Sequence, residues 1–536
     1  MKKDFDKKNY CEDYCIKKDI AEKIKKSTSG ITLIALVITI IVILILAGVS
    51  IMTLTGENGL IQRAAKAKTE TEDAAEYEKF RLAVQAAKID GLGTVNTESL
   101  TTELRNEGII GSEDTISSLP TAVTVNGKSY IVKKDGSIQE GSDVSGASTP
   151  QVSDALKTST TLYYVTWKDN KDGTFTEVDS QTQPAGWYNY SEKKWANIKT
   201  VANGATAYWV WIPRYEYNAS NITAGARNEK TIDVKFIDKT QTTADTGYVI
   251  PDAFTFDGKN LDGIWVAKFE ASSTNQAADF GGGDTTSLKV QVLPSVQSWR
   301  NITPANIFTV CRNMQSGGTI GTVADTVADT HMMKNTEWGV CALLSRSVYG
   351  KNGQVWNNPY EDNTNRSGFS DPSILKTGMA SSSENGANAY ASNAYGTAAI
   401  PCNPYNEGNG PQASTTGTVY GVYDMAGGAS EYVAGCLEET ETTTFGITTD
   451  EVSKYINSYT NTTNSGSNYS GALPGDATKE TAGWYNDYAG FVTSYDPVFK
   501  RGGYCYSGAY AGVFNFNDNY GDANDNYGFR PTLVVF

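Results

Sequence analysis

The chain alternates between one long apolar run, one amphipathic stretch and many short aromatic clusters. Residues 31–54 read ITLIALVITIIVILILAGVSIMTL and contain no charged side chain. About 20 such residues cross the hydrocarbon core of a bilayer, so the run predicts a transmembrane helix, with a buried core helix as the alternative. Residues 1–30 carry nine Lys and six acidic residues, which favours a cytoplasmic leader. The pattern predicts a single-pass protein of the cell membrane whose C-terminal part is extracellular.

After the sequence TGENG at residues 55–59, apolar residues recur with the spacing of a helix. From Leu60 to Ile89, Tyr77, Phe80, Val84 and Ala87 fall on one helical face. A short helix and short strands with tight turns follow, so residues 55–140 predict a long helix with a small β unit. Gly, Ser, Thr and Asp are frequent after Glu140, and residues 141–160 are therefore predicted to be a linker.

Residues 161–536 consist of short aromatic segments separated by Gly, Asn, Asp and Thr. Helices are expected near Thr303 and Thr336, each of which has the side chain of an N-cap residue. Many short strands with few helices and long polar loops are typical of an α+β domain that carries its function in loops. The whole chain is therefore predicted to be α+β, with a long N-terminal transmembrane helix and a small β unit before this larger domain.

Composition narrows the possible functions. The 45 Lys and Arg stand against 60 Asp and Glu, and the resulting net charge of −15 disfavours nucleic acid as a partner. Aromatic residues make up 11% of the chain and charged residues 20%, which disfavours global disorder. His331 is the single histidine, so multi-histidine metal sites are excluded. The 31 Tyr and 51 Gly suit a loop-rich binding surface better than a helical enzyme.

Candidate catalytic groups each have a structural interpretation that we favour. His331 lies beside two methionines without an acidic pattern, which predicts a core position or a surface filler. Asp262, Asp424 and Glu431 lie in turn-like settings in which carboxylates usually cap backbone groups. Five cysteines outside the leader are an odd number, and any disulfide among them stays open: Cys311, Cys341, Cys402, Cys436 and Cys505. We therefore expect no catalytic residue, no metal site and no cofactor.

The start of the chain resembles the prepilin cleavage motif of type IV pilins. Lysines and small polar residues precede Gly30, and an apolar run begins at Ile31. The resemblance implies that a prepilin peptidase cuts between Gly30 and Ile31, and that residues 31–140 resemble a minimal pilin subunit. Ala35 departs from the pattern, because assembling pilins usually carry a glutamate at that position. Assembly as a major filament subunit is therefore disfavoured, a simple anchor or a minor-subunit role is favoured, and a structural minor subunit of a type IV pilus-like filament remains an alternative function.

Motifs further along resemble the formylglycine-generating-enzyme branch of the C-type lectin fold. In chain order they are AYWVWIPRYEY (207–217), GIWVAKFEAS (263–272), KNTEWGVCALL (334–344), GVYDMAGGASEYVAG (421–435), RGG (501–503) and GFRP (528–531). The resemblance implies this fold over roughly residues 200–536, with Trp209, Trp211, Trp265 and Trp338 in the core. Arg530 should be paired if it is buried. The oxidase of this family needs two cysteines together in a groove, and it remains the alternative function.

Residues 504–527, YCYSGAYAGVFNFNDNYGDANDNY, are termed the C-terminal segment, and they contain five Tyr, five Asn and three Asp. Asn codons are adenine–adenine–pyrimidine, and replacing adenines yields Tyr, Asp, Ser, Cys, Ala or Gly. This alphabet resembles the variable proteins of diversity-generating retroelements. The resemblance implies diversified, ligand-facing residues at Tyr504, Tyr506, Ser507, Tyr510, Asn515, Asn517, Asp518, Asn519, Tyr520, Asp522, Asn524, Asp525, Asn526 and Tyr527.

Cys505 is either a varied position or a scaffold position. The first hypothesis is therefore a surface-anchored adhesin or receptor of a Gram-positive bacterium. Its ligand would be a protein or glycan on another cell, a phage or a host. Tyr, Asn, Ser and Asp are the residues of adaptable binding surfaces. The repeated Asp and Asn could instead hold Ca²⁺, but the segment lacks a compact acidic cage. Val513, Phe514, Phe516 and Phe529 are expected to be buried beneath the displayed side chains.

Overall fold

The computed structural model describes residues 60–536 except 113, 117–118, 120, 126–127, 141–145, 185, 220–221, 223–228, 277–280, 361–373 and 382–401. The leader, the cleavage position Gly30–Ile31 and the apolar run 31–54 lie outside the described residues. The chain divides into two compact units. Of the described residues, the first unit takes those within 60–119, 124–128 and 133–137, and the second takes those within 120–123, 129–132 and 138–536.

The small unit is built on helix α2 (Leu60–Asp90), which agrees with the helix expected from Leu60 to Ile89. Phe80, Val84 and Ala87 are fully buried on one face of α2, as the helical period predicts. The shorter helix α3 (Thr97–Asn106) begins where the Asn96 side chain accepts hydrogen bonds from two backbone N–H groups. Three short strands form a sheet in the order β1-β2-β3, and most of their residues belong to the second unit: β1 (Thr121–Val125), β2 (Lys128–Val132) and β3 (Ile138–Glu140).

The predicted fold class and membrane location need correction. Among the described residues, most regular structure is strand, the helices other than α2 are short, and no helix is long and apolar enough to cross a membrane. Helix α2 has 31 residues, but Lys, Arg and Glu recur along it. The structure therefore describes a strand-rich fold and gives no support to an α+β protein with a transmembrane helix or to a single-pass anchor.

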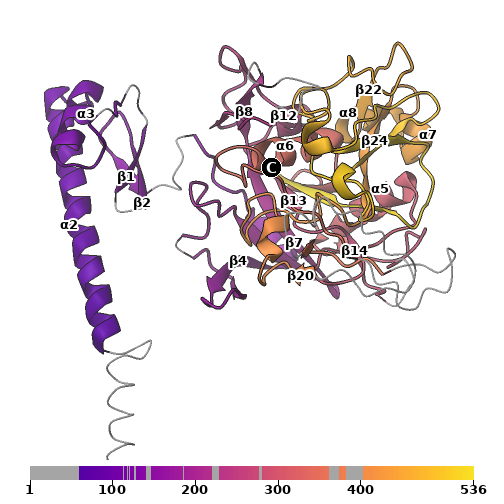
Figure 1. Ribbon diagram of the computed structural model, residues 1–536, viewed down its shortest axis with the longest axis horizontal. Helices are drawn as coiled ribbons and strands as arrows, with labels where there is room; N and C mark the ends of the chain where they lie inside the picture. The colour runs from indigo at the N-terminus through magenta and orange to yellow at the C-terminus, as the bar shows by residue number, and fades with distance from the viewer. Residues whose placement is uncertain are drawn as a thin grey trace, which may run out of the picture. The chain divides into compact units, whose positions relative to one another are not determined.

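The large unit contains a seven-stranded antiparallel sheet (Figure 1). The strand near the C-terminus, β26 (Pro531–Val535), pairs with β13 (Gly263–Ala267) on one side and β18 (Ala328–Met332) on the other. The chain end is thereby held inside the sheet. Along the order β18-β26-β13-β7-β6-β4-β5, the remaining strands are β7 (Ala205–Pro213), β6 (Asn197–Ala202), β4 (Thr161–Asp169) and β5 (Phe175–Ser180).

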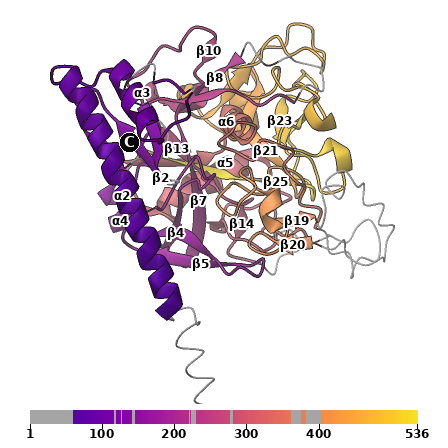
Figure 2. The same cartoon turned by 60° about the vertical axis from the view of Figure 1, so that its left-hand side comes forward.

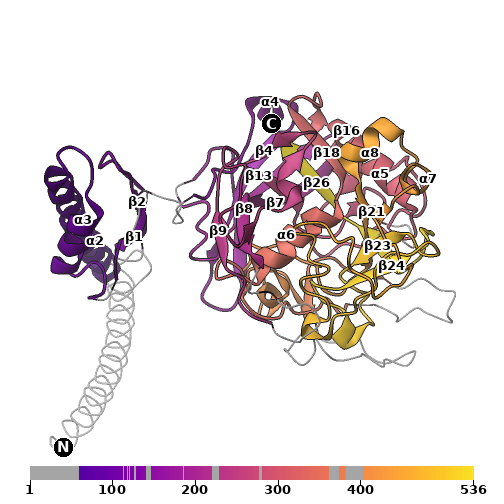
Figure 3. The same cartoon turned by 90° about the horizontal axis from the view of Figure 1, so that it is seen from above.

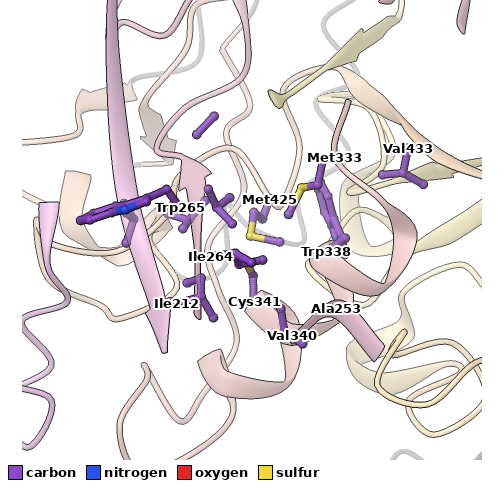
Figure 4. Close-up of a cluster of buried hydrophobic side chains, with 14 of the residues drawn as sticks. Ile212, Ala253, Ile264, Trp265, Met333, Trp338, Val340, Cys341, Met425 and Val433 are labelled. Atoms are coloured by element: carbon purple, nitrogen blue, oxygen red, sulfur yellow. The ribbon is translucent and has the colours of Figure 1, made fainter. Parts of the chain in front are cut away.

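The core of the large unit is aromatic. Trp209 and Trp211 of β7, Trp265 of β13 and Trp338 of α6 (Asn335–Ser345) are fully buried, which confirms the expected core positions. Every residue of α6 is buried. Figure 4 shows side chains from β13 and α6 meeting around Met425. Burying several aromatic side chains of 150–250 Å² each contributes strongly to the stability of such a sheet-and-helix core.

A second sheet carries the C-terminal segment. Its strands follow the order β22-β21-β23-β24, and β25 pairs in parallel with β21. Figure 3 shows β21, β23 and β24 side by side in orange and yellow. The bounds are β21 (Ser430–Leu437), β22 (Asn457–Tyr459), β23 (Val498–Arg501), β24 (Phe516–Asn519) and β25 (Tyr527–Phe529).

Short elements complete the large unit. Helix α5 (Pro304–Arg312) follows Thr303 and α6 includes Thr336, so both expected helices are confirmed, but the cap expected at Thr336 was wrong, because Lys334 is the N-cap of α6. The other helices and 3₁₀ turns are α4 (Asp154–Ser159), α7 (Glu441–Phe445), α8 (Thr449–Tyr455), η2 (Asp252–Phe254), η3 (Asn313–Gln315), η5 (Gly410–Ala413), η6 (Trp484–Asn486) and η7 (Gly508–Tyr510). The remaining strands are β8 (Tyr215–Asn218), β9 (Val234–Phe236), β10 (Tyr248–Val249), β11 (Thr255–Phe256), β12 (Lys259–Asn260), β14 (Ser272–Ser273), β15 (Val290–Gln291), β16 (Ser316–Gly318), β17 (Gly321–Thr322), β19 (Met379–Ser381) and β20 (Cys402–Pro404).

The second half of the expected linker is instead part of the large unit. Trp265 donates its indole N–H to the carbonyl of Gln151 over 2.7 Å. Ser148 donates to the carbonyl of Asp262, and Leu156 of α4 is fully buried. Residues 146–160 therefore pack on the domain through backbone acceptors and one apolar side chain, features that their Gly, Ser and Thr content does not predict.

Candidate ligand-binding face

The C-terminal segment connects two strands of the second sheet. It begins three residues after β23, forms the edge strand β24, and ends at the first residue of β25. Figure 2 shows β21, β23 and β25 together in orange and yellow. One loop, residues 502–515, precedes β24, and a second, residues 520–526, follows it. Both loops are therefore tied at each end to the same sheet.

Apolar side chains fix the first loop to the core. Val513, Phe514, Phe516 and Phe529 are each at most 3% exposed, which confirms their expected burial. The Phe514 ring packs edge-on against Trp484, with the ring centroids 5.1 Å apart. These four residues are termed the framework residues.

Hydrogen bonds fix the backbone of the same loop. The N–H of Phe514 donates to the Asp487 carboxyl group over 3.0 Å, and the indole of Trp338 donates to the Val513 carbonyl over 2.8 Å. A Cβ atom on Gly512 would lie 2.2 Å from an Asp487 oxygen, so glycine is required by this close approach. Burial raises the pKa of Asp487 well above its usual range. The loop is consequently held by groups outside the C-terminal segment.

Most of the expected ligand-facing side chains keep access to solvent. Tyr510 and Tyr520 are 61% and 65% exposed. The half-buried positions are Tyr504, Tyr506, Ser507, Asn517, Asp518, Asp522, Asn524, Asp525, Asn526 and Tyr527. The segment thus separates buried framework residues from displayed Tyr, Asn, Asp and Ser.

Two expected ligand-facing residues are instead structural. Asn515 and Asn519 are 5% and 7% exposed. The Asn515 amide donates to the Tyr510 carbonyl over 2.6 Å, and the Asn519 side-chain oxygen accepts hydrogen bonds from the Tyr432 hydroxyl and the Gly521 N–H. Their expected exposure was therefore wrong, because each side chain satisfies polar groups inside a loop.

Tyr527 is half-buried because its ring packs against two residues of the second sheet. Its ring lies 3.8 Å from the Lys500 ammonium and packs edge-on against Tyr432 at 5.4 Å. Burial lowers the pKa of Lys500 to about 8. The aromatic face stabilises the buried cation, so Tyr527 contributes to the sheet as well as to the surface.

Arg300 lies beneath the segment, and Cys505 is a buried residue within it. The buried Arg300 side chain donates to the carbonyl of Asp525, and burial lowers its pKa. Cys505 is 3% exposed and packs with Leu375 and Ala429, which indicates a scaffold position. Sequence patterns missed Arg300, Asp487 and Tyr432 because they lie far from the segment in the chain. Lys500, a lysine within the strand sequence VFKR, was a signal that could have been noticed.

The candidate catalytic carboxylates act within the scaffold. Glu431 pairs with Arg530 through two oxygens, and both residues are fully buried. Asp424 accepts the Gly378 N–H at 2.8 Å, and Asp262 accepts the Lys239 N–H at 3.0 Å. The capping roles of Asp424 and Asp262 and the pairing of Arg530 are confirmed, whereas the capping role expected of Glu431 was wrong, because its carboxylate binds the Arg530 guanidinium.

His331 is a core residue. Its ring lies between Asp329 and Glu337, with ring nitrogens 3.1 and 2.9 Å from their carboxylate oxygens. Burial lowers the pKa of His331, but the two carboxylates outweigh this effect and leave the pKa raised. Burial raises the pKa of Asp329, yet His331, Arg312 and Lys454 bring it to about 2. This arrangement is an ion-paired cluster enclosed in the protein.

The five cysteines outside the leader, all within the described residues, form no disulfide. Cys311, Cys341, Cys436 and Cys505 are buried, and Cys402 is half-buried. Burial raises the pKa of Cys402 and of Cys436 to about 12, which disfavours the thiolate that metal binding or nucleophilic attack requires. Within the described ranges, no three His, Cys, Asp or Glu side chains are grouped as a metal site would need.

Comparisons with known proteins add little. No family model matches the chain, and no curated protein matches it. A solved structure similar to the chain is the Major Tropism Determinant U1 Variant, with 12% identity and a TM-score of 0.22. The match covers 77% of this chain and 80% of that chain. A score this low does not establish a shared fold, so any functional assignment depends on the residues of this chain.

Proposed function

We propose that this chain is a ligand-binding protein, adhesin-like or receptor-like, whose binding face is the C-terminal segment. The observation that carries the proposal is the separation of buried framework residues from displayed polar and aromatic ones within one short segment. A backbone held by the core allows displayed side chains to change without loss of the fold. The proposed ligand is a protein or glycan carried by another cell, a phage or a host.

The displayed residues have suitable chemistry for binding. Tyrosine offers a large amphipathic contact with little rotamer entropy to lose, whereas Asn, Ser and Asp offer adaptable hydrogen bonds. Tyr510 and Tyr520 are the most exposed members of the segment. They would act as the aromatic anchors of an interface whose remaining contacts are polar.

We further propose that a retroelement diversifies this face. An Asn-rich template altered at adenines would produce the Tyr, Asp and Ser found at displayed positions. Tyr, Asp and Ser each arise from an Asn codon when one adenine is changed. The Val and Phe of the framework residues would require changes at both adenines. Their burial gives a physical reason why such codons would be spared.

No catalytic step belongs to this proposal. The raised pKa values of the Cys402 and Cys436 thiols argue against the oxidase alternative. Glu431 and Asp424 are occupied by scaffold partners. Binding alone therefore accounts for the displayed residues.

A display library tests the proposal. One library varies five displayed positions to Tyr, Asn, Asp or Ser: Tyr510, Asn517, Asp518, Tyr520 and Asp522. A control library varies five exposed positions on or beside β4 and β5 of the seven-stranded sheet: Lys168, Asp172, Thr176, Gln181 and Gln183. The first library should stay folded and yield binders to unrelated target proteins, whereas the control should not. Loss of folding in the first library, or an equal yield from both, would count against the proposal.

A further inference from the structure

The exposed tyrosines extend beyond the C-terminal segment. In the part of the chain that the structure describes, four tyrosines are exposed: Tyr488 at 49%, Tyr495 at 82%, Tyr510 at 61% and Tyr520 at 65%. Tyr488 and Tyr495 precede β23 and lie outside the C-terminal segment. Leaving a large aromatic ring in water brings no folding benefit, so a cluster of them suggests an interaction surface.

Tyr488 lies at one end of β24, next to Tyr510. Its N–H donates to the Tyr510 carbonyl over 3.1 Å, and its carbonyl accepts from the Phe516 N–H over 3.1 Å. A Cβ atom built on Gly490 would lie 2.8 Å from the Tyr488 ring and 3.0 Å from the Asn517 side-chain oxygen. The Tyr488 ring therefore borders the displayed side chains of the C-terminal segment.

Tyr495 lies towards the other end of β24. Val498 of β23 pairs with Asn519 of β24, which brings the residues before Val498 towards those after Asn519. The hydrogen bond to Asp522 and the charges of Asp522 and Asp496 raise the pKa of Tyr520. Since β24 has four residues, its first and last residues are separated by ~10 Å at about 3.3 Å per step.

The charge between these ends is negative. Asp496, Asp518 and Asp522 are half-buried and act on the same Lys500 ammonium. Between residues 487 and 527 the basic residues are Lys500 and Arg501, which are 6% and 0% exposed. The accessible charge of this surface therefore comes from carboxylates.

We infer that Tyr488 and Tyr495 belong to the ligand face, and that the carboxylates between the tyrosine pairs select a protein partner that presents Lys or Arg side chains. This inference rests on the proposed function and names the partner's chemistry. Tyrosine rings bind cations through their faces, and carboxylates pair with them directly. Because Tyr488 and Tyr495 lie outside the segment that is proposed to be diversified, they would supply a contact common to all versions of the face.

A peptide selection tests the inference. A random peptide library displayed on phage is selected on the immobilised full chain at about 0.15 M salt. We expect the selected peptides to be enriched in Lys and Arg and to bind more weakly at 1 M salt, where the Debye length falls to about 3 Å. The double variant Y488A/Y495A should weaken their binding about 30-fold, equivalent to ~2 kcal/mol at 1.4 kcal/mol per tenfold change.

Matched variants separate the contributions. D496N/D522N should abolish the preference for basic peptides, whereas D257N/E407Q removes two exposed carboxylates elsewhere and should leave the preference unchanged. V348A truncates an exposed apolar side chain away from the face and should not affect binding. Melting temperatures of all variants verify that each remains folded.

Two outcomes distinguish failure of the inference from failure of the proposed function. Neutral or acidic peptides whose binding is lost in Y510A/Y520A would overturn the charge preference and leave the binding face in place. Basic peptides unaffected by Y488A/Y495A would remove the two outer tyrosines from the face. Selected peptides that bind independently of every face variant would overturn both proposals.

Discussion

Replacing Phe514 by Ala tests whether the framework residues hold the binding face. Phe514 is 1% exposed, and its ring contacts Trp484 edge-on at 5.1 Å. Truncating a buried Phe to Ala costs about 3–5 kcal/mol through lost transfer energy and the cavity left behind. The cost is highest where the surroundings cannot collapse into the cavity.

Collapse is restricted at this position. The Phe514 N–H is bound to Asp487, and the preceding Val513 carbonyl is bound to Trp338. Neither end of the residue can move inward without breaking a buried hydrogen bond. We therefore expect a loss of about 4 kcal/mol, in the upper half of the range.

Urea unfolding measures the global effect, and hydrogen exchange measures the local one. Amides of residues 513–516 should exchange up to ~1000-fold faster in the Phe514→Ala variant if the loop opens separately. Tyr510→Ala is the matched control, because its ring is 61% exposed and its loss should change stability by no more than ~0.5 kcal/mol. A cost below ~1 kcal/mol for Phe514→Ala, or above ~2 kcal/mol for Tyr510→Ala, would refute the division into framework and displayed residues.

Three further predictions concern the scaffold. The raised pKa of His331 contributes stability that is fully present below the unfolded pKa near 6.5 and is lost as pH rises through the folded pKa. The difference in unfolding free energy between the parent and His331→Gln, measured by urea titration, should therefore shrink at higher pH. A pH-independent difference would contradict this. Arg530→Met should cost about 3–5 kcal/mol of unfolding free energy by leaving Glu431 buried without its partner, and adding Glu431→Gln should recover part of it. Tyr527→Phe keeps the ring over Lys500 and should melt like the parent, whereas Tyr527→Ala should lose more than ~1 kcal/mol; equal melting of both would contradict the cation contact.

Some of the fold could be predicted from local patterns. The helical spacing of Phe80, Val84 and Ala87 predicts a buried face, and the structure has one. Apolar residues at fixed places in the C-terminal segment predict burial for Phe514 and Phe516. Such inferences succeed because apolar side chains gain most from burial wherever the chain can provide it.

Polar residues were harder to place. Asn515 and Asn519 have the same side chain as the displayed Asn517, and their burial depends on partners such as Tyr432 that are distant in sequence. The packing of residues 146–160 likewise depends on backbone carbonyls, which have no sequence signature. The apolar run that predicts the membrane anchor, residues 31–54, lies outside the described residues, and none of the described helices is long and apolar enough to cross a membrane.

The central claim is that the C-terminal segment is a diversified binding face, and sequencing the surrounding genomic DNA tests it most directly. We expect a near-copy of the DNA that encodes residues 504–527, close to a reverse-transcriptase gene. Its mismatches should fall at template adenines in the codons of displayed residues such as Tyr510 and Tyr520, while the codons of Val513, Phe514 and Phe516 match. Absence of a near-copy from the complete genome, or mismatches spread over all four bases and the framework codons, would contradict the account.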